Sequence, residues 1–368
     1  MTRRRGFDIA ILGGGPAGLV AALAAAKNAR TLLVLNRPVP HEAPLRIDVV
    51  PAQTLALLAE LGIPPRALGV EGLHDRQGAS WESGTPTWKR GAKTGHIERR
   101  RLERALLDAV RAHGRIRIVA DGTRPKFDGD FCGRGWRAKH LIDATGRAAV
   151  TAQARVRFRP AWASRFFWIP REATRATAEF RIAALPSGYA YRLGSAEHIG
   201  IGVVGRGASL KADAARLDRL LNDDAWPWLC EDMPPLQAMN RGSSGVTSVQ
   251  WAVPGAAALI GDAALARDPL CSQGLAASLS DAFYATAAIQ SGDTASLRER
   301  HAENLSAHLT HLRTALTTCR FRDQPHWTAY EKFIAAHGGG WTRRPAAALR
   351  HGRLEPVPSP GGLFIARE

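Results

Sequence analysis

The sequence has few of the residues that build metal centres and disulfide frameworks. Only four of its 368 residues are cysteine, and Cys132, Cys230, Cys271 and Cys319 are far apart, with no C-x-x-C pair and no cysteine–histidine run at zinc spacing. We therefore expect neither a metal site nor a disulfide framework. No window approaches the ~18 uncharged apolar residues that a membrane-spanning helix requires, so no membrane span is expected either.

Acidic residues are scarce relative to basic ones. Asp and Glu total 33 against 50 Lys and Arg, which gives a net charge of +17 and a pI of about 10.8. Such a charge attracts an anionic cofactor, an acidic partner or nucleic acid. Many arginines stand in Ala/Arg-rich stretches, so a compositional bias of the source genome explains the charge equally well. No helix-turn-helix, zinc finger or aromatic RNA-binding signature is present, and we do not expect nucleic acid as a partner.

The remaining composition is typical of a globular protein. Hydrophobic residues make up 45% and charged residues 23% of the chain, and its length at roughly 150 residues per domain predicts about two domains. The start, Met1-Thr-Arg-Arg-Arg-Gly before an apolar stretch, imitates a signal peptide. Asp8 interrupts that stretch, however, and a glycine fingerprint follows it. We therefore expect a cytoplasmic protein.

Hydrophobic periodicity predicts an α/β first part, a β-rich second part and a helical end. Buried strands are expected over residues 7–12, 31–35, 140–146 and 256–262. Helices are expected over residues 19–27, 51–62, 98–113, 275–290 and, with many His and Arg, 297–335. Short strands separated by Gly and Pro are expected between about 155 and 250, among them 177–182, 189–193 and 198–204. The last thirty or so residues, rich in Gly, Pro and Arg, are expected to be irregular.

A glycine fingerprint follows the first predicted strand. Gly13, Gly15 and Gly18 fit G-x-G-x-x-G between a strand and a helix, within a βαβ unit of about 30 residues. The first glycine allows the tight turn, the second lets backbone N–H groups approach a pyrophosphate, and the third lets helix and strand pack closely. The N-terminus of the helix favours negative charge. This context predicts a dinucleotide-binding site.

One position departs from the dinucleotide pattern. At the end of the second strand, where Glu or Asp normally accepts from the ribose hydroxyls, the chain has Asn36 followed by Arg37. The side-chain carbonyl of Asn36 can still accept a hydrogen bond, but without the charge-assisted gain, a loss of ~1 kcal/mol or about fivefold in affinity. We expect both residues to contact the cofactor, and Asn36 to weaken the site without abolishing it.

Two later segments resemble the second and third FAD signatures of the p-hydroxybenzoate hydroxylase-like superfamily. The first is Asp143-Ala-Thr-Gly-Arg147 at the end of a strand. The second is Leu259-Ile-Gly-Asp-Ala-Ala264, followed by Asp268-Pro-Leu-Cys-Ser-Gln-Gly274. The resemblance covers residues 7–147 and 255–290, and more loosely the chain to about 330. It implies that FAD is the cofactor.

The resemblance also implies roles for individual residues. Asp262 holds the ribityl chain, and Pro269 and Gly274 shape the pocket where oxygen meets the flavin. The helix from Leu275 aims its N-terminal N–H groups at the N1/O2 edge of the ring, and Arg99 contacts the phosphate region. Fingerprint and resemblance together give these expected cofactor contacts: Gly13, Gly15, Pro16, Ala17, Gly18, Asn36, Arg37, Arg46, Arg99, Ala144, Thr145, Gly146, Gly261, Asp262, Pro269, Ser272, Gln273, Gly274 and Leu275.

The fold class that follows is α/β. It consists of a Rossmann-like FAD-binding domain (the GR2, p-hydroxybenzoate hydroxylase-like type), an inserted β-rich substrate domain and a helical C-terminal region. The FAD-binding domain is expected to be discontinuous, over residues 1–75, 96–150 and 251–315. The substrate domain is expected over 76–95 and 151–250, and a helical or irregular region over 316–368.

The electron source is expected to be a separate flavin reductase. Members that take hydride from NADPH usually carry an Asp-Gly pair before a second Arg after the Ala-Thr-Gly region, and neither that pair nor a second G-x-G-x-x-G is recognisable here. The chain therefore resembles the branch that contains tryptophan halogenases and geranylgeranyl-reductase-like proteins, where reduced flavin often comes from another protein. Direct use of NAD(P)H stays open.

Within that branch the chain is similar to flavoprotein maturases that hydroxylate a peptide-bound tryptophan on the way to tryptophylquinone cofactors. The similar segments are residues 51–62, residues 268–274 and Arg320-Phe-Arg-Asp-Gln-Pro-His-Trp327. The resemblance implies an O₂-using monooxygenase in which a flavin C4a-hydroperoxide hydroxylates an electron-rich aromatic ring. The expected substrate is a tryptophan side chain in a peptide or partner protein, and an acidic partner would give the net charge a steering role.

The substrate pocket has five candidate residues, although no catalytic residue is assigned. They are His96, Tyr189, Tyr191, Pro269 and Gly274. His96 precedes the helix that bears Arg99 and could serve as an acid or base, or could simply cap or pack. Tyr189 and Tyr191 alternate along a strand and face the same side, where they could stack on an aromatic substrate or pack in the core. Cys271 could be redox-active or a covalent anchor, although a buried filler is the simpler interpretation.

Other functions stay open. A free indole or phenol could be the substrate of a hydroxylase or halogenase. The halogenase motif Trp-x-Trp-x-Ile-Pro is only partly matched by Phe167-Trp-Ile-Pro170, Tyr189-Ala-Tyr-Arg-Leu-Gly194 stands where the motif is expected, and Lys89 or Lys93 would have to be the pocket lysine. A geranylgeranyl-reductase-like oxidoreductase would transfer hydride without using oxygen. A flavin-bearing binding protein would perform no chemistry.

Overall fold

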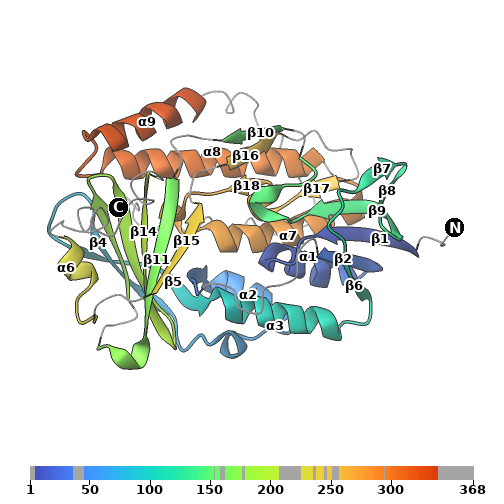
Figure 1. Cartoon of the computed structure of the whole chain (residues 1–368), viewed down its shortest axis with the longest axis horizontal. Coiled ribbons are helices and arrows are strands. Elements are labelled where there is room, and N and C mark those ends of the chain that lie inside the picture. The colour runs from blue at the N-terminus through green and yellow to red at the C-terminus, as the bar shows by residue number, and fades with distance from the viewer. Residues whose placement is uncertain are drawn as a thin grey trace.

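The computed structural model of the chain describes residues 5–35, 45–152, 154–157, 162–175, 179–206, 225–234, 238–243, 247–250, 257–293 and 295–338. Two large sheets lie at opposite ends of the molecule, and long helices run between and along them (Figure 1). Among the described residues, no helix combines the length and the apolar character needed to cross a membrane.

The first sheet is built around the N-terminal strand. Its order is β6-β2-β1-β9-β8-β7, with β17 beside β9, and β1, β2, β6, β9 and β17 are parallel. Its strands are β1 (Arg5–Leu12), β2 (Thr31–Leu35), β6 (Ile116–Ala120), β7 (Lys126–Asp128), β8 (Asp130–Gly133), β9 (Trp136–Asp143) and β17 (Ala257–Leu259). The carboxyl ends of the parallel strands therefore share one edge, which is where ligands bind in such sheets.

Helices α1 (Pro16–Ala26), α3 (Arg99–Ala112) and α7 (Gly274–Ser291) pack together on this sheet. α1 is rich in alanine and buried on almost every side, because its small side chains let both α3 and α7 approach closely. α3 is amphipathic: Leu102, Leu106 and Val110 enter the core, while its other face carries arginines. The short helix α2 (Ala52–Glu60) adds Leu55 and Leu58 to the same core.

The second sheet has the order β15-β11-β14-β13-β12-β4-β5-β3, and all its pairs are antiparallel except β12 with β4. Its strands are β3 (Ile47–Pro51), β4 (His74–Ser80), β5 (Thr87–Glu98), β11 (Trp162–Pro170), β12 (Phe180–Leu185), β13 (Gly188–Gly194), β14 (His198–Arg206) and β15 (Ala238–Ser243). A small sheet joins β10 (Ala154–Arg157), β16 (Thr247–Gln250) and β18 (Leu265–Ala266). The short helix α6 (Ala225–Leu229) packs on β12.

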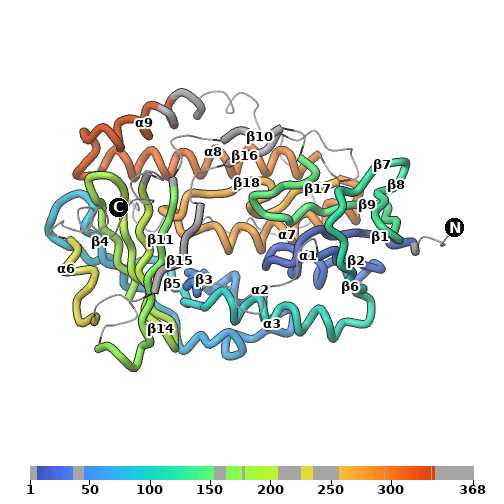
Figure 2. The backbone as a smooth tube through the Cα atoms, in the orientation of Figure 1, coloured from blue at the N-terminus to red at the C-terminus, as the bar shows by residue number. Residues whose placement is uncertain are grey.

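Two C-terminal helices cover one face of the second sheet. α8 (Ala295–Thr317) runs along the length of the molecule, and α9 (Pro325–Gly338) lies beside it (Figure 2). Trp327 and Tyr330 of α9 pack with Trp81 and Tyr189 in one core cluster. The indole Nε1 of Trp327 donates to the Leu185 carbonyl oxygen at 2.8 Å, which fixes α9 to the end of β12.

The expected α/β fold is confirmed, with several shifted boundaries. α1 begins at Pro16 and not at residue 19, because proline is well suited to the first helical turn. The strand expected over 177–182 is Phe180–Leu185 within the described residues, and the strand expected over 256–262 is only Ala257–Leu259. The helical stretch expected over 297–335 is two helices separated at residues 318–324, with Pro325 beginning the second.

The hairpin of β4 and β5 was not recognised as strands from the sequence. The outer half of β5 is exposed and polar, so it shows no hydrophobic alternation. The hairpin joins the second sheet through β12. The domain boundaries themselves stay a prediction, and the irregular tail from residue 339 lies outside the described residues.

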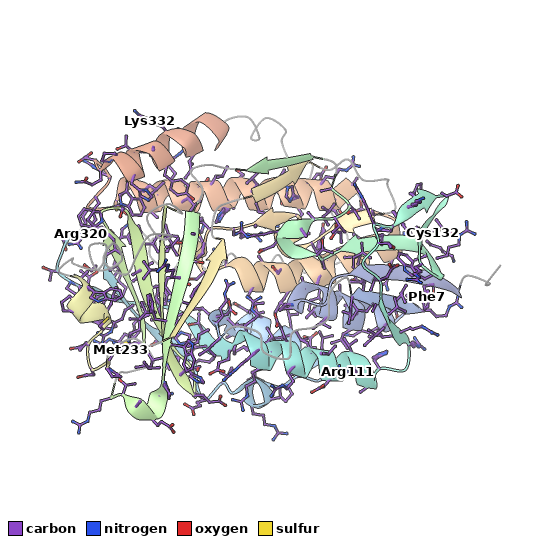
Figure 3. All side chains as sticks on the ribbon, viewed as in Figure 1. Phe7, Arg111, Cys132, Met233, Arg320 and Lys332 are labelled. Carbon is purple, nitrogen blue, oxygen red and sulfur yellow. The ribbon has the colours of Figure 1, made fainter. Side chains whose placement is uncertain are left out.

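The four cysteines are free thiols, as the sequence predicts. Cys132 and Arg320, the chain neighbour of Cys319, lie at opposite ends of the molecule (Figure 3). Burial raises the pKa of Cys319 and Cys230 to about 11, so both stay protonated near neutral pH.

Candidate functional site

The glycine fingerprint forms the turn between β1 and α1. Gly13 has φ +107°, and a Cβ there would lie 2.5 Å from the Ala144 carbonyl oxygen. A Cβ on Gly18 would lie 2.0 Å from the Gly13 carbonyl oxygen, so these two positions accept only glycine. Gly15 differs because its φ is −78° and a Cβ would meet nothing within 4 Å. Its missing side chain therefore leaves room for a ligand and does not serve packing.

That open space belongs to a cavity of about 250 Å³, which we name the dinucleotide cavity. It lies where the carboxyl edge of the first sheet meets β3, β11 and β13 of the second. Its lining contains many of the expected cofactor contacts: Gly15, Pro16, Ala17, Arg46, Arg99, Ala144, Gly146, Asp262, Pro269, Ser272, Gly274 and Leu275. It also contains residues that were not expected: Ile47, Asp48, Val49, Arg147, Ser164, Phe166, Leu193, Ile260, Arg267, Asp268 and Ser278.

The remaining expected contacts lie outside this lining. Gly13, Gly18 and Gly261 shape the backbone behind the cavity: Gly261 has φ +56°, and a Cβ there would crowd Ala17 and Ser278. Thr145 and Gln273 are not part of the lining either. Asn36 and Arg37 lie outside the described residues.

A pair of arginines on one carboxylate forms one wall of the cavity. Arg99, the first residue of α3, donates from Nε and Nη2 to the two carboxylate oxygens of Asp48 at 2.7 and 2.9 Å. Arg46 Nε lies 3.4 Å from Asp48 Oδ1. Although burial opposes ionisation of Asp48, the two guanidinium charges hold its pKa below the usual value. Asp48 therefore fixes two cations at the cavity wall, a role that the sequence alone did not reveal.

The Asp143–Gly146 segment is held by its own side chains. Asp143 is fully buried and accepts from the N–H and hydroxyl of both Thr145 and Thr151, at 2.6–2.9 Å. The Thr145 hydroxyl is thereby engaged in the turn, and it also accepts from the Val150 N–H. This network places Ala144 and Gly146 at the cavity edge, so Thr145 positions the turn.

Asp262 lies in the turn after β17, at the same edge as Ala144. Its carboxylate is 44% exposed, and Arg147 Nε lies 3.7 Å from Asp262 Oδ2. The carboxylate is thus available to hydroxyl groups of a ligand in the cavity.

The loop Asp268–Gly274 forms the far end of the cavity and rests on a buried polar network. Asp268 is 1% exposed and accepts from the Tyr189 hydroxyl at 2.6 Å, the Tyr330 hydroxyl at 3.1 Å and the Leu270 N–H at 2.9 Å. Its own N–H donates to His308 Nε2 at 3.0 Å. Burial raises the pKa of Asp268 above its usual value. Strand β13 and helices α8 and α9 therefore each fix this loop by a hydrogen bond to Asp268.

A second cavity of about 270 Å³ lies on the other side of the same loop, and we name it the hairpin cavity. Pro269 and Ser272 line the dinucleotide cavity, whereas Leu270 and Cys271 line the hairpin cavity. Its other lining residues come from β4, β5, the turn between them, α8 and the residue after α8: Gln77, Ala79, Trp81, Glu82, Ser83, Thr85, Thr87, Lys89, His311, Ala315 and Thr318. Trp81, Ala315 and Leu270 are buried, whereas residues 82–85 and Thr87 and Lys89 are exposed. The buried end of the cavity is therefore largely apolar, with Gln77 as a buried polar member, and its mouth is polar.

Of the pocket candidates His96, Tyr189 and Tyr191, only Tyr191 lines one of the two cavities. His96 is buried and stacks on His74, and its Nδ1 lies 2.8 Å from the Gly194 carbonyl oxygen, so it belongs to neither cavity. Tyr189 is a core residue that reaches the loop through Asp268. Tyr191 lines the dinucleotide cavity, and its ring is 6.5 Å from that of Tyr189, so the two face the same side as expected.

Cys271 has the character of a buried filler. It is 6% exposed, and burial raises the pKa of its thiol well above the usual value, which leaves little thiolate. Of the two proposed pocket lysines, Lys89 lines the hairpin cavity and Lys93 lines neither cavity.

Sequence comparisons find no relatives: no protein-family model matches the chain, and no curated protein sequence matches it. Solved structures do match. QhpG, a peptidyl tryptophan dihydroxylase essential for tryptophylquinone cofactor biogenesis, aligns with a TM-score of 0.69 and 20% identity over 89% of this chain and 79% of its own.

Two halogenases align comparably. The myxobacterial chondrochloren halogenase CndH, a variant of FAD-dependent halogenases, gives a TM-score of 0.70 at 18% identity over 91% of both chains. The flavin-dependent halogenase CmlS gives 0.72 at 16% identity over 89% of this chain and 68% of its own. The chain thus has the fold of these flavin-dependent enzymes, with two cavities on either side of one buried loop.

Proposed function

We propose that the protein is an FAD-dependent monooxygenase that hydroxylates an electron-rich aromatic ring, with a tryptophan side chain in a peptide or protein as its substrate. The observation that carries the proposal is the loop Asp268–Gly274, which has the dinucleotide cavity on one side and an apolar-ended cavity on the other. The similarity of fold to a peptidyl tryptophan dihydroxylase supports it.

The residues of the dinucleotide cavity suit FAD. Gly15 leaves its edge open to a pyrophosphate, the α1 N-terminus points there, and Arg46 and Arg99 add positive charge. Asp262 offers an exposed carboxylate to ribityl hydroxyls. Gly274 begins α7, so the N-terminal N–H groups of that helix face the cavity end where the flavin ring belongs. When bound and reduced, FAD supplies the activation of O₂ for transfer of one oxygen atom.

The chain's own part is to position the substrate and exclude water. Leu270, Trp81 and Ala315 give the inner end of the hairpin cavity an apolar wall for an indole ring. Trp81 is itself fixed, because its Nε1 donates to the Ala315 carbonyl oxygen at 2.7 Å. Pro269 lines the dinucleotide cavity and Leu270 lines the hairpin cavity, so FAD and the substrate ring would lie on opposite faces of the same loop.

The mouth of the hairpin cavity favours a peptide over a free amino acid. The hydroxyls of Ser83, Thr87 and Thr318 donate to backbone carbonyls, so their oxygens can accept from peptide N–H groups. The Thr85 hydroxyl can also donate to a peptide C=O group. The exposed hairpin turn leaves the mouth open to a chain that continues beyond the inserted side chain. The net charge of +17 supports an acidic peptide or partner.

The test begins with purified protein reconstituted with FAD. We expect a bound-flavin spectrum that is bleached by NADH only when a flavin reductase is added, and oxygenated tryptophan in an acidic peptide after oxygen is readmitted. The same peptide with phenylalanine in place of tryptophan is the control and should remain unmodified. Failure to bind FAD would overturn the whole assignment, and bleaching by NADPH without a reductase would overturn the reductase dependence. Turnover that leaves the tryptophan peptide unchanged would overturn its role as the substrate.

Halogenation is the second candidate. The observation in its favour is Lys89, which lines the hairpin cavity, together with the similarity of fold to halogenases. Turnover with added chloride or bromide and free tryptophan, indole or phenol separates the two functions: a halogenated product supports the second candidate, and an oxygenated peptide supports the first. The polar side chains of Gln77, Thr87 and Lys89 in the cavity disfavour an isoprenoid-type reductase, whose reacting isoprenoid chain is apolar.

A further inference from the structure

Arg267 is a buried cation beside the loop that separates the two cavities. It follows β18 directly, precedes Asp268, is 7% exposed and contributes to the lining of the dinucleotide cavity. Its Nη1 atom is buried and has no hydrogen-bond partner, and no ion pair joins Arg267 to a carboxylate in the part of the chain that the structure describes.

The other arginines of this cavity are paired. Arg99 and Arg46 share Asp48, and Arg147 lies beside Asp262. Asp268, the nearest carboxylate to Arg267 in the sequence, uses its oxygens for Tyr189, Tyr330 and the Leu270 N–H. His308, on the neighbouring helix α8, uses Nε2 to accept from the Asp268 N–H. Arg267 is therefore left with a charge that its described surroundings do not neutralise.

A buried cation without a partner destabilises a protein unless a ligand brings the missing anion. The ligand's phosphates are accounted for at the other end of the cavity, by Gly15, the α1 N-terminus, Arg46 and Arg99. Arg267 stands at the loop end, among Asp268, Pro269 and Ser272, where the isoalloxazine ring belongs. That ring gains negative charge at its N1/O2 edge on reduction.

We propose that Arg267 is the counter-ion of the anionic reduced isoalloxazine. The inference rests on the proposed binding of FAD and goes beyond it, since it assigns a charge-stabilising residue that the α7 N-terminus only supplements. Arg267 therefore favours reduced over oxidised FAD. It makes the bound flavin easier to reduce by an external electron donor.

The experiment measures the two-electron reduction potential of bound FAD in the wild type and in R267M, R267Q and R267K. Loss of the charge in R267M and R267Q should lower the preference for reduced over oxidised FAD by tenfold to a hundredfold, which corresponds to about 30–60 mV for a two-electron couple. R267K keeps a charge and should retain most of the wild-type potential. Melting of the FAD-free proteins is the second readout, and R267M should melt about 2 °C or more above wild type because an unpaired buried charge is gone.

Arg181 provides a matched control. It is equally buried, at 5% exposure, but its guanidinium pairs with Glu179 and Glu231 and lies outside both cavities. R181M should leave the flavin potential unchanged and lower the melting temperature, the opposite sign from R267M.

The outcomes separate this inference from the proposed function. If wild-type protein binds no FAD, both fail. If FAD binds but its potential is the same in R267M, R267Q and wild type, the counter-ion role is wrong while the flavoprotein assignment stands. If chloride or bromide perturbs the spectrum of the oxidised flavin in wild type and not in R267M, the anion that Arg267 holds is inorganic, and the assignment to the reduced ring is overturned.

Discussion

Gly15 and Gly18, three residues apart, serve the first turn for opposite reasons. Gly18 is required by packing, since a Cβ would lie 2.0 Å from a backbone oxygen, whereas Gly15 faces open cavity. A pair of alanine variants therefore distinguishes folding from ligand binding at one turn.

We predict that G18A loses ~3 kcal/mol of unfolding free energy or more, because the clash is with backbone that cannot move aside. G15A should stay within about 1 kcal/mol of wild type, since its φ suits alanine although the N-cap position does not. G15A should nevertheless bind FAD at least about tenfold more weakly, because the methyl group occupies the space where the pyrophosphate approaches. Denaturant unfolding measures the stability of the two variants, and flavin titration measures the FAD affinity of G15A. Equal FAD affinity in G15A and wild type would contradict the placement of the cofactor.

Asp268 gives a prediction with a definite sign in pH. Burial raises its pKa in the folded protein, so the native state holds this proton more tightly than the unfolded chain does. The stabilisation from that proton is complete below the unfolded pKa of about 3.9 and is lost as pH rises through the folded value. Wild type should therefore lose stability relative to D268N as pH rises from about 4 towards neutrality. Urea unfolding of the two FAD-free proteins across this range is the measurement. A wild-type stability that stays constant or increases relative to D268N as pH rises would show that Asp268 is ionised without cost.

At the scale of elements, the hairpin cavity depends on parts of the chain that are far apart. The β4–β5 hairpin supplies one wall and the end of α8 supplies the other, and Trp81 bonds to the Ala315 carbonyl across them. The cavity can be filled from the α8 side without touching the dinucleotide cavity.

We predict that T318W abolishes formation of the oxygenated peptide while FAD content and flavin reoxidation stay at wild-type levels. Thr318 lines the hairpin cavity, and an indole there takes the place of the substrate ring. Thr317 is its exposed neighbour outside the cavity, so T317W should retain activity within about twofold. Product analysis by mass spectrometry reports the effect. A T318W protein as active as T317W would place the substrate elsewhere.

The sequence predicted those features of the site that depend on local backbone geometry. Gly13, Gly15 and Gly18 could be read from spacing alone, because each requirement arises within one turn. The Arg99–Asp48 pair could not, because its members are 51 positions apart and β3 has no separate signal in the sequence. His96 was a reasonable candidate by its position next to α3, but the register of β3 and β5 places it in the sheet interior.

The hairpin cavity was also beyond sequence reasoning. It forms only where residues 77–89 and 311–318 meet over residues 270–271 of the loop. The exposed outer half of β5, which supplies part of its lining, has no period-two pattern in the sequence. The buried charge of Arg267 likewise becomes visible only when its neighbours in space are known.

At the scale of the whole molecule, the dominant property is the net charge of +17. If this charge steers an acidic peptide or partner, the interaction must weaken as salt shortens the Debye length from ~10 Å at 0.1 M to ~3 Å at 1 M. We predict that KM for an acidic tryptophan peptide rises roughly tenfold between about 0.05 and 0.5 M salt, with little change in kcat. A neutral peptide of the same length is the control. Equal salt dependence of the two KM values would show that the net charge does not steer the acidic peptide and only reflects the amino-acid composition.

In the proposed function the two cavities serve one reaction, transfer of oxygen to an aromatic side chain. The most direct measurement is turnover of the FAD-reconstituted protein with a flavin reductase, NADH, a tryptophan-containing acidic peptide and isotopically heavy O₂, followed by mass spectrometry of the peptide. We predict heavy oxygen on the tryptophan residue in wild type and none in T318W. A peptide that contains no heavy oxygen, although FAD is bound, reduced and reoxidised, would contradict it.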